Sequence, residues 1–374
     1  MEKWMGGGDM HPSYRILMGP GPSNVHYRVY QAMSNPVIGY LDPQILACMD
    51  EISEMLRGVF QTKNPVTLAI SGTGSSGMEA SYVNFVEPGD VVVIGISGFF
   101  ADRMAQVASR CGAKVLRVEE EWGKIVEPEK MIKALKDHPE AKICGVVHGE
   151  TSTGVRQPLE EIGAYCKKRN ILFVVDAVTT LGGYDMKVDE WGIDVCYSSS
   201  QKCLSVPPGL SPITVSPKAM NILHARKTKV QSFYLDLILL EKYWGRERVY
   251  HHTAPASMFY ALREGLKIVM EEGLEDRYRR HEVLGDRLKM ELEDLGFRLF
   301  AQEGYRLPML TAVVLPDRLD DAQIRKRLLD EYNIEVGGGL GWLKGKIWRI
   351  GLMGETCKTR YIHCFMGALK EILT

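Results

Sequence analysis

The sequence predicts an α/β fold built around a mostly parallel sheet, and three observations lead to this. From about residue 60, short apolar runs alternate with amphipathic stretches, as strands and helices do in βαβ units. The apolar runs are nearly continuous, which is typical of strands buried on both faces. Apolar residues make up 45% of the 374-residue chain and charged residues 25%, a composition that excludes disorder, collagen and coiled coil.

Up to about residue 215, the expected elements follow one another as strand and helix. We expect strands at 66–70, 91–97, 114–119, 143–147, 172–175, 195–198 and 213–215. The helices expected between them cover 78–87, 100–110, 129–136 and 159–168. Turn residues mark their ends: Pro88-Gly89-Asp90 follows the first helix, Cys111-Gly112 follows the second, and Pro128 opens the third.

The pattern changes after about residue 256. Two long helices, at 258–272 and 274–295, are interrupted at Gly273. The remaining chain predicts strands at 297–300, 312–315 and 348–352 and helices at 322–331 and 359–373. We therefore expect an N-terminal arm at 1–15, a large domain at 16–272, and a smaller α+β domain at 273–374.

Charge and hydropathy limit the partners and the compartment. The 46 lysines and arginines balance 47 acidic residues, so no basic field exists to hold nucleic acid or an anionic membrane. No apolar run approaches the roughly 18 residues of a membrane span, and the first residues lack the apolar core of a secretory signal. The eight cysteines form no C-x-x-C pair, so we expect free thiols and a cytoplasmic protein.

A glycine-rich loop, Ser71–Gly77, follows the first expected strand and matches G-x-G-x-x-G. Such a loop lets backbone amides approach a phosphate at a helix N-terminus. A dinucleotide site also needs an acidic residue at the tip of the next strand, where this chain has Ser97-Gly98. No lysine follows the last glycine, which excludes a Walker A loop. A site for one phosphate and an ordinary turn both remain possible.

Two charged residues end later strands. Asp176 follows the apolar run Leu172–Val175, and Lys202 follows the strand at 195–198 after a short polar segment. Taken singly, a strand-end aspartate is more often a helix cap and a lysine a solvated surface residue. Together with the glycine loop, they form the set that pyridoxal phosphate needs: a phosphate cup, a carboxylate for the ring nitrogen and an amine to carry the cofactor.

These and other motifs, in this order and spacing, resemble fold-type I pyridoxal-phosphate enzymes of the class V aminotransferase family, most closely the alanine–glyoxylate and serine–pyruvate group. The motifs are Gly19–Asn24, Ser71–Gly77, Glu87–Asp90, His148–Gly154, Val175-Asp176, Ser198–Lys202 with Pro207-Pro208-Gly209, Tyr250–Thr253 and Arg349–Leu352. The resemblance implies that the large domain holds a seven-stranded, mostly parallel sheet flanked by helices.

The resemblance also implies cofactor contacts. Lys202 would carry pyridoxal phosphate, and Asp176 would pair with its ring nitrogen. The phosphate would be bound by Thr73, Gly74, Ser75 and Gln201. Thr151 would lie near the ring oxygen, and Phe100 would stack on the ring, a role that its neighbour Phe99 could equally fill. Tyr250 and Thr253 would reach the phosphate of a neighbouring subunit, which makes the expected active unit a homodimer.

Substrate contacts are expected from three places. Arg349 lies in an apolar strand, where an unpaired charge is costly, so it needs either a structural acid or a substrate carboxylate. The resemblance favours the substrate. It also places backbone groups around Gly21 at the substrate pocket and brings Tyr40 from the partner chain. We expect no metal, because the adjacent residues His251 and His252 should point apart on an extended segment.

The activity implied is ping-pong transamination from a small amino acid, alanine or serine, to a small keto acid, glyoxylate or pyruvate. Alternatives remain open: another donor such as ureidoglycine or an aminophosphonate, or a pyridoxal-phosphate lyase or desulfurase. A nicotinamide-dependent dehydrogenase would leave Asp176 and Lys202 without a role. A silent binding subunit would not need Lys202, Asp176 and Arg349 together.

Overall fold

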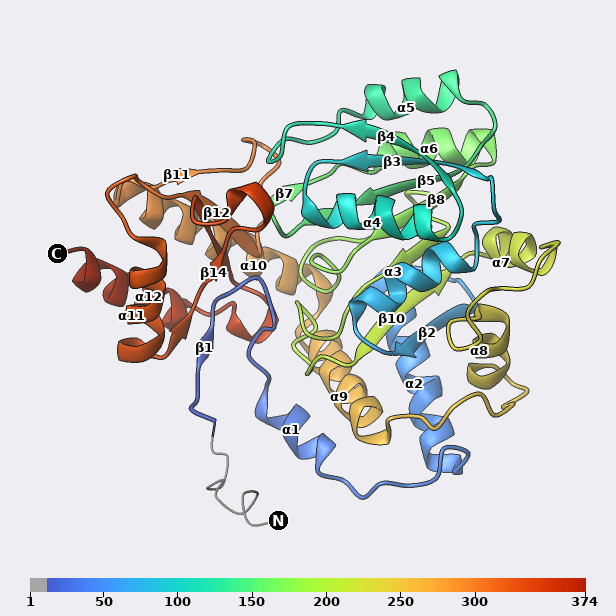
Figure 1. Cartoon of the computed structure of the whole chain (residues 1–374). Helices are drawn as coiled ribbons and strands as arrows, with labels where there is room; N and C mark the ends of the chain where they lie inside the picture. Colours follow the sequence, from blue (N-terminus) through green and yellow to red (C-terminus); the bar gives the residue numbers. More distant parts are fainter. Residues whose placement is uncertain (1–11) are drawn as a thin grey trace, which may run out of the picture.

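The computed structural model describes residues 12–374 and shows a large sheet-centred body beside a smaller α/β body (Figure 1). Of the expected N-terminal arm, residues 1–11 lie outside the described part. Over residues 12–374, no helix is both long enough and apolar enough to cross a membrane. All eight cysteines are free, as expected, and all but Cys111 and Cys364 are buried.

The central sheet has seven strands in the order β2-β10-β9-β8-β5-β3-β4. Their bounds are β2 Val66–Ser71, β3 Val91–Ile96, β4 Lys114–Glu119, β5 Ala141–Val147, β8 Leu172–Asp176, β9 Val195–Tyr197 and β10 Leu210–Val215. Only β10 runs antiparallel to its neighbours. The predicted mostly parallel seven-stranded sheet is therefore confirmed, and the tips of β8 and β9 meet at one edge.

Helices flank this sheet, with α3 and α4 in front of it in Figure 1. Those of the large body are α1 Tyr27–Met33, α2 Pro43–Phe60, α3 Gly74–Val83, α4 Phe99–Arg110, α5 Pro128–Asp137, α6 Glu160–Arg169, α7 Pro217–His224, α8 Leu237–Trp244 and α9 Ala256–Glu272. The short strands β6 Gly149–Glu150 and β7 Val155–Arg156 form a separate hairpin.

Two differences from the predicted elements have local causes. Helix α3 begins at Gly74, four residues before the predicted start at 78, because the glycine loop itself forms its first turn. Helices α1, α2, α7 and α8 were not predicted. The signals for α2 were present: Asp42 caps it by accepting from the amide of Gln44 at 2.8 Å, and its buried residues recur with helical spacing.

The smaller body has its own core, formed by 21 buried residues that include Trp348 and Phe365. Its elements are α10 Leu274–Asp294, β11 Arg298–Leu299, β12 Leu310–Val314, α11 Asp321–Tyr332, β13 Ile334–Glu335, β14 Gly337–Gly338, η1 Gly341–Leu343, β15 Ile347–Gly351, η2 Gly354–Thr356 and α12 Thr359–Leu373. Four of these strands form a sheet in the order β11-β12-β15-β14.

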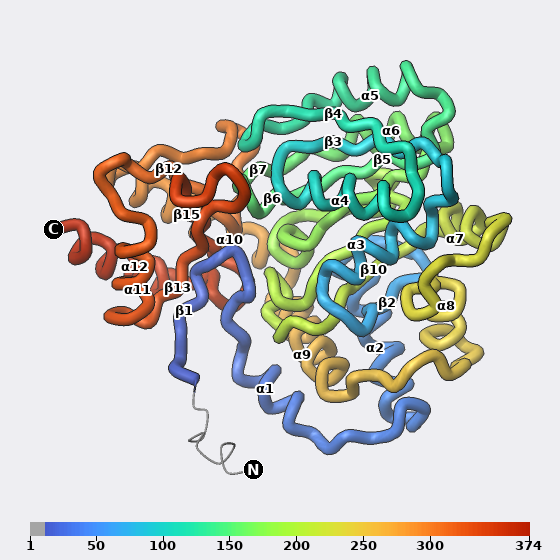
Figure 2. Tube along the Cα trace, viewed as in Figure 1, coloured from blue at the N-terminus to red at the C-terminus, as the bar shows by residue number. Residues whose placement is uncertain are grey.

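The start of the described chain joins this smaller body. Strand β1, Ile16–Leu17, pairs in parallel with β13, and Met18 belongs to the smaller core. Figure 2 shows this blue segment running alongside the red C-terminal region before it enters the large body. We therefore propose that the two domains divide at Gly273, with residues 16–18 docked on the C-terminal domain.

Candidate active site

One cavity of about 180 Å³ collects residues from four predicted motifs. Eight of the ten predicted cofactor-binding residues line it: Thr73, Gly74, Ser75, Phe100, Thr151, Asp176, Gln201 and Lys202. Met78, Arg103, Val147, Gly149 and Val178 complete the lining. The cavity lies where β8 and β9 end, because parallel strands deliver their carboxyl ends to the same edge of the sheet.

The N-terminus of α3 forms one end of this cavity. Thr73 precedes the helix, and Gly74 and Ser75 are its first two residues, so their amides have no acceptor within the helix. Gly74 leaves no room for a side chain, since a Cβ there would lie 2.8 Å from the Cβ of Ser199. The buried side-chain oxygens of Ser199 and Gln201 have no hydrogen-bond partner in the described structure. The free amides and the Ser199 hydroxyl can donate to an anion at this end, whereas Gln201 Oε1 is an acceptor.

Asp176 ends β8 and is 3% exposed. Its Oδ1 accepts from the amide of Val178 at 2.8 Å, and its Oδ2 accepts from the hydroxyl of Tyr197 at 2.8 Å. Burial raises the pKa of this carboxyl to about 6, although both hydrogen bonds oppose the rise. A cationic partner would strongly stabilise the ionised form of this buried carboxyl and would lower its pKa again.

Lys202 enters the cavity from the loop after β9. Its Nζ donates to the carbonyl of Pro20. Burial and, to a smaller extent, the nearby charge of Arg349 together lower the pKa of the amine to about 8. A lysine with a pKa close to neutrality is partly unprotonated and can act as a base or nucleophile.

The predicted substrate-binding residues Gly21 and Arg349 lie beside this lysine. A Cβ on Gly21 would lie 2.7 Å from Lys202 Nζ, so only glycine leaves the amine free there. Arg349 is 7% exposed, and its Nε donates to the carbonyl of Gly338 at 2.7 Å. Its Nη1 lies 3.4 Å from the carbonyl of Thr151, which lines the cavity. Within residues 12–374, no acidic side chain forms an ion pair with Arg349.

Phe100, and not Phe99, lines the cavity. The two rings meet edge to face at 5.6 Å, and the guanidinium of Arg103 lies over both, 5.1 and 5.2 Å from their centres. Their backbone is held by Glu150, whose Oε2 accepts from the amide of Phe100 at 3.1 Å.

Glu150 is a site residue for which we predicted no role. It is fully buried, and besides Phe100 it accepts from Ala101 at 3.0 Å and from both the amide and hydroxyl of Ser152. It therefore caps α4 and fixes the segment that contains Thr151. The signal available was an acidic residue three positions after the apolar strand at 143–147, where a buried charge needs hydrogen-bond donors.

Tyr40, Tyr250 and Thr253 do not reach this cavity. The rings of Tyr40 and Tyr250 contact each other at 4.6 Å, Tyr250 is 52% exposed, and Thr253 is exposed. These three residues are therefore available at the surface rather than in their own subunit's cavity.

The expectation that His251 and His252 point apart is wrong. Their Nδ1 atoms lie 2.8 Å apart, because the segment is not a regular strand and turns the two rings toward each other. The remaining nitrogens have separate partners. His252 Nε2 lies 2.7 Å from the hydroxyl of Ser71, and His251 Nε2 lies 3.1 Å from the carbonyl of Phe233. The pair thus supports the start of the glycine loop.

A buried histidine beneath the site makes stability depend on pH. Burial lowers the pKa of His148 to about 3, so it stays neutral when folded but becomes protonated below about pH 6.5 when unfolded. The unfolded state then binds more protons, and this residue's contribution to the free energy of unfolding falls as pH falls, by at most about 1.4 kcal/mol per pH unit. The unfolding free energies of wild type and His148→Asn should converge between pH 6.5 and 5 in urea titrations. Unfolding free energies that stay parallel over this pH range would contradict this.

The residues of the cavity fit pyridoxal phosphate. The amides of α3 and the unpartnered Ser199 hydroxyl suit its phosphate, the acceptor Asp176 suits a protonated ring nitrogen, and Lys202 suits its aldehyde. The flat ring of Phe100 borders the space between these groups.

Comparisons with known proteins agree with this geometry. The family profile for class V aminotransferases matches residues 24–344. The chain is 41% identical to the (S)-ureidoglycine–glyoxylate transaminase of Bacillus subtilis, over 96% of this chain and 90% of that protein, and 40% identical to mouse alanine–glyoxylate aminotransferase, over 96% and 87%. The crystal structure of alanine–glyoxylate aminotransferase from Nostoc sp. has a TM-score of 0.96 at 48% identity, covering 98% of this chain and 97% of that one. The chain therefore belongs to the class V aminotransferases, fold-type I enzymes that use pyridoxal phosphate to exchange amino groups between amino acids and keto acids.

Proposed function

We propose that this transaminase moves the amino group of alanine or serine to glyoxylate or pyruvate. The observation that carries this is Arg349, a buried guanidinium without an acidic partner in residues 12–374, close enough to Lys202 to lower its pKa. An α-carboxylate bound there would place the α-carbon of a small substrate near the lysine amine. Glyoxylate appears in the names of the relatives described above, which supports it as the acceptor.

We assign the chemical steps to two side chains. When bound, pyridoxal phosphate supplies an electron sink for charge that develops at the substrate α-carbon. The unprotonated Nζ of Lys202 removes the proton from that carbon and later returns a proton, a role for which its lowered pKa suits it. Val178 and Tyr197 hold the carboxylate of Asp176 in place. This negative charge would stabilise the protonated, positively charged ring nitrogen and would thereby make the ring a better electron acceptor.

The identity of the amino donor is supported by less evidence than that of the acceptor. The relative from Bacillus subtilis is named for ureidoglycine and the mouse relative for alanine, at nearly equal identity. A panel of alanine, serine, ureidoglycine and an aminophosphonate, each followed by the cofactor's absorbance in a single half-reaction, would decide between them. Conversion fastest with alanine or serine supports the proposal, and conversion only with ureidoglycine would replace the donor while keeping the reaction.

Replacing Arg349 by lysine should mainly weaken substrate binding. Lysine keeps the charge but loses the two parallel hydrogen bonds that a guanidinium gives a carboxylate. We expect kcat/KM for alanine to fall by about 10- to 100-fold, mostly through KM, a loss of roughly 1.4–2.7 kcal/mol. Steady-state kinetics with Arg325→Lys as the control would measure this. Arg325 also lies in the C-terminal domain but pairs with Asp321. An unchanged KM would contradict the assignment.

We further propose a homodimer with shared active sites. Several large aromatic side chains of the large body are exposed outside the cavity, among them Tyr27, Tyr30, Phe233 and Tyr250. A surface of this kind is typical of an interface, and Tyr40, Tyr250 and Thr253 would then reach the partner's cavity. Sedimentation should give twice the monomer mass. Mixing inactive Lys202→Ala with a weakened Thr253→Val variant should raise activity above the sum of the two, which independent sites would not do.

We place the enzyme in the cytoplasm. The eight cysteines are all free, which supports this compartment because disulfides are rare in the cytoplasm. Fractionation of cells that express the untagged chain tests it, and recovery with a membrane or secreted fraction would contradict it.

A further inference from the structure

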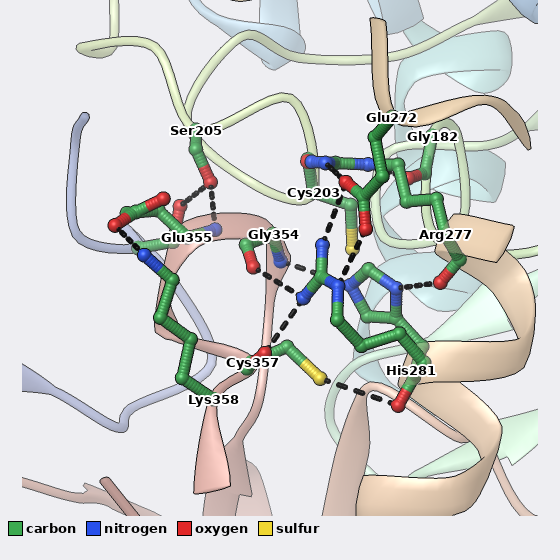
Figure 3. Close-up of polar contacts among 12 residues, drawn as sticks. Gly182, Cys203, Ser205, Glu272, Arg277, His281, Gly354, Glu355, Cys357 and Lys358 are labelled. Atoms are coloured by element: carbon green, nitrogen blue, oxygen red, sulfur yellow. Dashed lines mark hydrogen bonds and ion pairs between the residues drawn. The ribbon is translucent and has the colours of Figure 1, made fainter. Parts of the chain in front are cut away.

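Behind the Lys202 loop lies a buried charged cluster that the reaction does not use directly. Figure 3 shows Arg277, at the start of α10, reaching toward Cys203, Gly182 and Glu272. Arg277 is 3% exposed. Glu272 is the last residue of α9, and Gly273 between them has a φ of +82°, so the cluster spans the junction of the two domains.

The guanidinium of Arg277 bonds three segments at once. Its Nε donates to the carbonyl of Gly182 at 2.7 Å, its Nη2 donates to the carbonyl of Cys203 at 2.5 Å, and its Nη1 pairs with Glu272. Cys203 directly follows Lys202, and Gly182 lies in the turns that follow Asp176. One planar group therefore connects the backbone beyond both catalytic residues.

The rest of the lysine loop is fixed from the opposite side. The amide of Ser23 donates to the carbonyl of Gln201 at 2.9 Å, and its hydroxyl donates to the carbonyl of Lys202 at 2.8 Å. Ser205, at a φ of +55°, closes the loop by donating its amide to the carbonyl of Lys202 at 3.0 Å. Arg277 donates to the carbonyl of Cys203, so the three successive carbonyls of residues 201–203 all accept hydrogen bonds.

The C-terminal domain completes the cluster. Arg280, one turn after Arg277, pairs with Glu272 and donates to the carbonyls of Gly354 and Cys357 at 3.0 and 2.6 Å. The amide of Gly354 donates to Nε2 of the buried His281 at 2.9 Å. This ring is therefore neutral, with its proton on Nδ1 facing the carbonyl of Arg277 at 2.7 Å. Nothing larger than glycine fits at 354, where a Cβ would lie 2.5 Å from the carbonyl oxygen of Cys203.

We propose that Arg277 is a positioning residue for transamination. It fixes the position of the Lys202 loop relative to the turn after Asp176. Its fork geometry matters more than its charge, because two of its three partners are neutral carbonyls of different segments. A displacement of the lysine amine by even about 1 Å can cost about 100-fold in rate. The inference rests on the proposed roles of Lys202 and Asp176.

The test compares Arg277→Lys with Arg280→Lys. Both variants keep a positive charge, both positions lie on α10, and both native arginines pair with Glu272, but only Arg277 bonds the lysine loop. The first measurement uses the cofactor-free protein. Trace acetylation with acetic anhydride across a pH series, followed by peptide mass spectrometry, gives the reactivity of Lys202 relative to the exposed Lys133. We expect Arg277→Lys to change this relative reactivity at least threefold and Arg280→Lys to leave it within the error of wild type.

The second measurement uses the loaded enzyme. In Arg277→Lys we expect kcat to fall by about 10- to 100-fold with KM for the amino donor within about twofold, because substrate binding at Arg349 is untouched. Urea unfolding of both variants measures how much the free energy of unfolding of each falls below that of wild type. Unchanged Lys202 reactivity in a folded Arg277→Lys protein, or equal losses of kcat in the two variants, would overturn the proposal and leave Arg277 as a structural ion pair.

A third variant covers the case in which Arg277→Lys does not fold. Glu272→Gln keeps Arg277 but replaces the carboxylate that orients its guanidinium by a weaker, neutral acceptor. We expect a smaller change in the reactivity of Lys202, and an unaltered acetylation profile would overturn the proposal. Failure of the function itself looks different. A wild-type enzyme without transamination, but with Lys202 reactivity that still depends on Arg277, would leave the positioning role intact and refute the assigned reaction.

Discussion

Replacing Lys202 by alanine is expected to lower the rate of transamination by more than about 10³-fold. The amine is the one basic nitrogen placed in the cavity with a pKa near neutrality among the residues described, at about 8. Arg103 also lines the cavity, but a guanidinium does not give up its proton. With Lys202 removed, the described cavity lining retains no amine to move the α-proton, and the cofactor loses its covalent attachment.

Two measurements separate this effect from a folding defect. The cofactor's visible absorbance and its fixation by borohydride should disappear in Lys202→Ala, while the thermal unfolding midpoint of the cofactor-free protein stays close to wild type. Lys133→Ala is the matched control, since Lys133 lies on the exposed face of α5. Turnover within tenfold of wild type in Lys202→Ala would refute the assignment of this residue.

Replacing Asp176 by asparagine is expected to lower the rate of transamination while raising the stability of the cofactor-free protein. Asparagine fits the same space, because its oxygen can accept from the amide of Val178 while its amide donates to the hydroxyl of Tyr197. The variant keeps the geometry but loses the negative charge that favours the electron sink. We expect kcat to fall by at least about 100-fold, comparable with the loss of a buried charge that orients a catalytic group.

The cofactor-free Asp176→Asn protein should at the same time be more stable than wild type at neutral pH. Burial raises the pKa of the folded carboxyl to about 6 from 3.8, so the folded state binds more protons than the unfolded state between these values. Wild type loses stability as pH rises through about 6, by up to about 3 kcal/mol in total, and the variant does not.

Urea titrations of both cofactor-free proteins at pH 5 and pH 8 measure this difference. The gain from Asp176→Asn should be larger at pH 8. A variant that is less stable at pH 8 than at pH 5, relative to wild type, would contradict the assigned cause. Retained kcat together with the expected gain in stability would instead show that the buried charge has no role in the reaction.

The fold class was predictable from local sequence pattern, because strands buried on both faces appear in the sequence as nearly continuous apolar runs. The apolar runs at 91–97 and 172–175 and the turn residues after each helix located the strands of the sheet to within a few residues. Helix α2 was missed although its cap and its helical spacing were present. The start of α3 was placed late, because glycines weaken the helical pattern while their amides begin the helix.

Most of the site was also predictable, for a topological reason. Parallel strands bring their carboxyl ends to one edge, so Asp176 and Lys202, separated by 25 intervening residues, had to meet near the glycine loop. The choice between Phe99 and Phe100 was not predictable. It depends on the capping of α4 by Glu150, which comes from a different segment.

Local sequence pattern was thus enough to predict the sheet, the glycine-rich loop and the chemical identity of the two central side chains. The groups that hold these side chains became visible only in the folded chain. The contact of the two histidines at 251 and 252, the bonds of Glu150, and the fork of Arg277 on Gly182 and Cys203 all join segments that are distant in sequence or irregular in backbone. Local propensity and periodicity carry no information about such contacts, because they form only when packing has fixed the backbone on both sides.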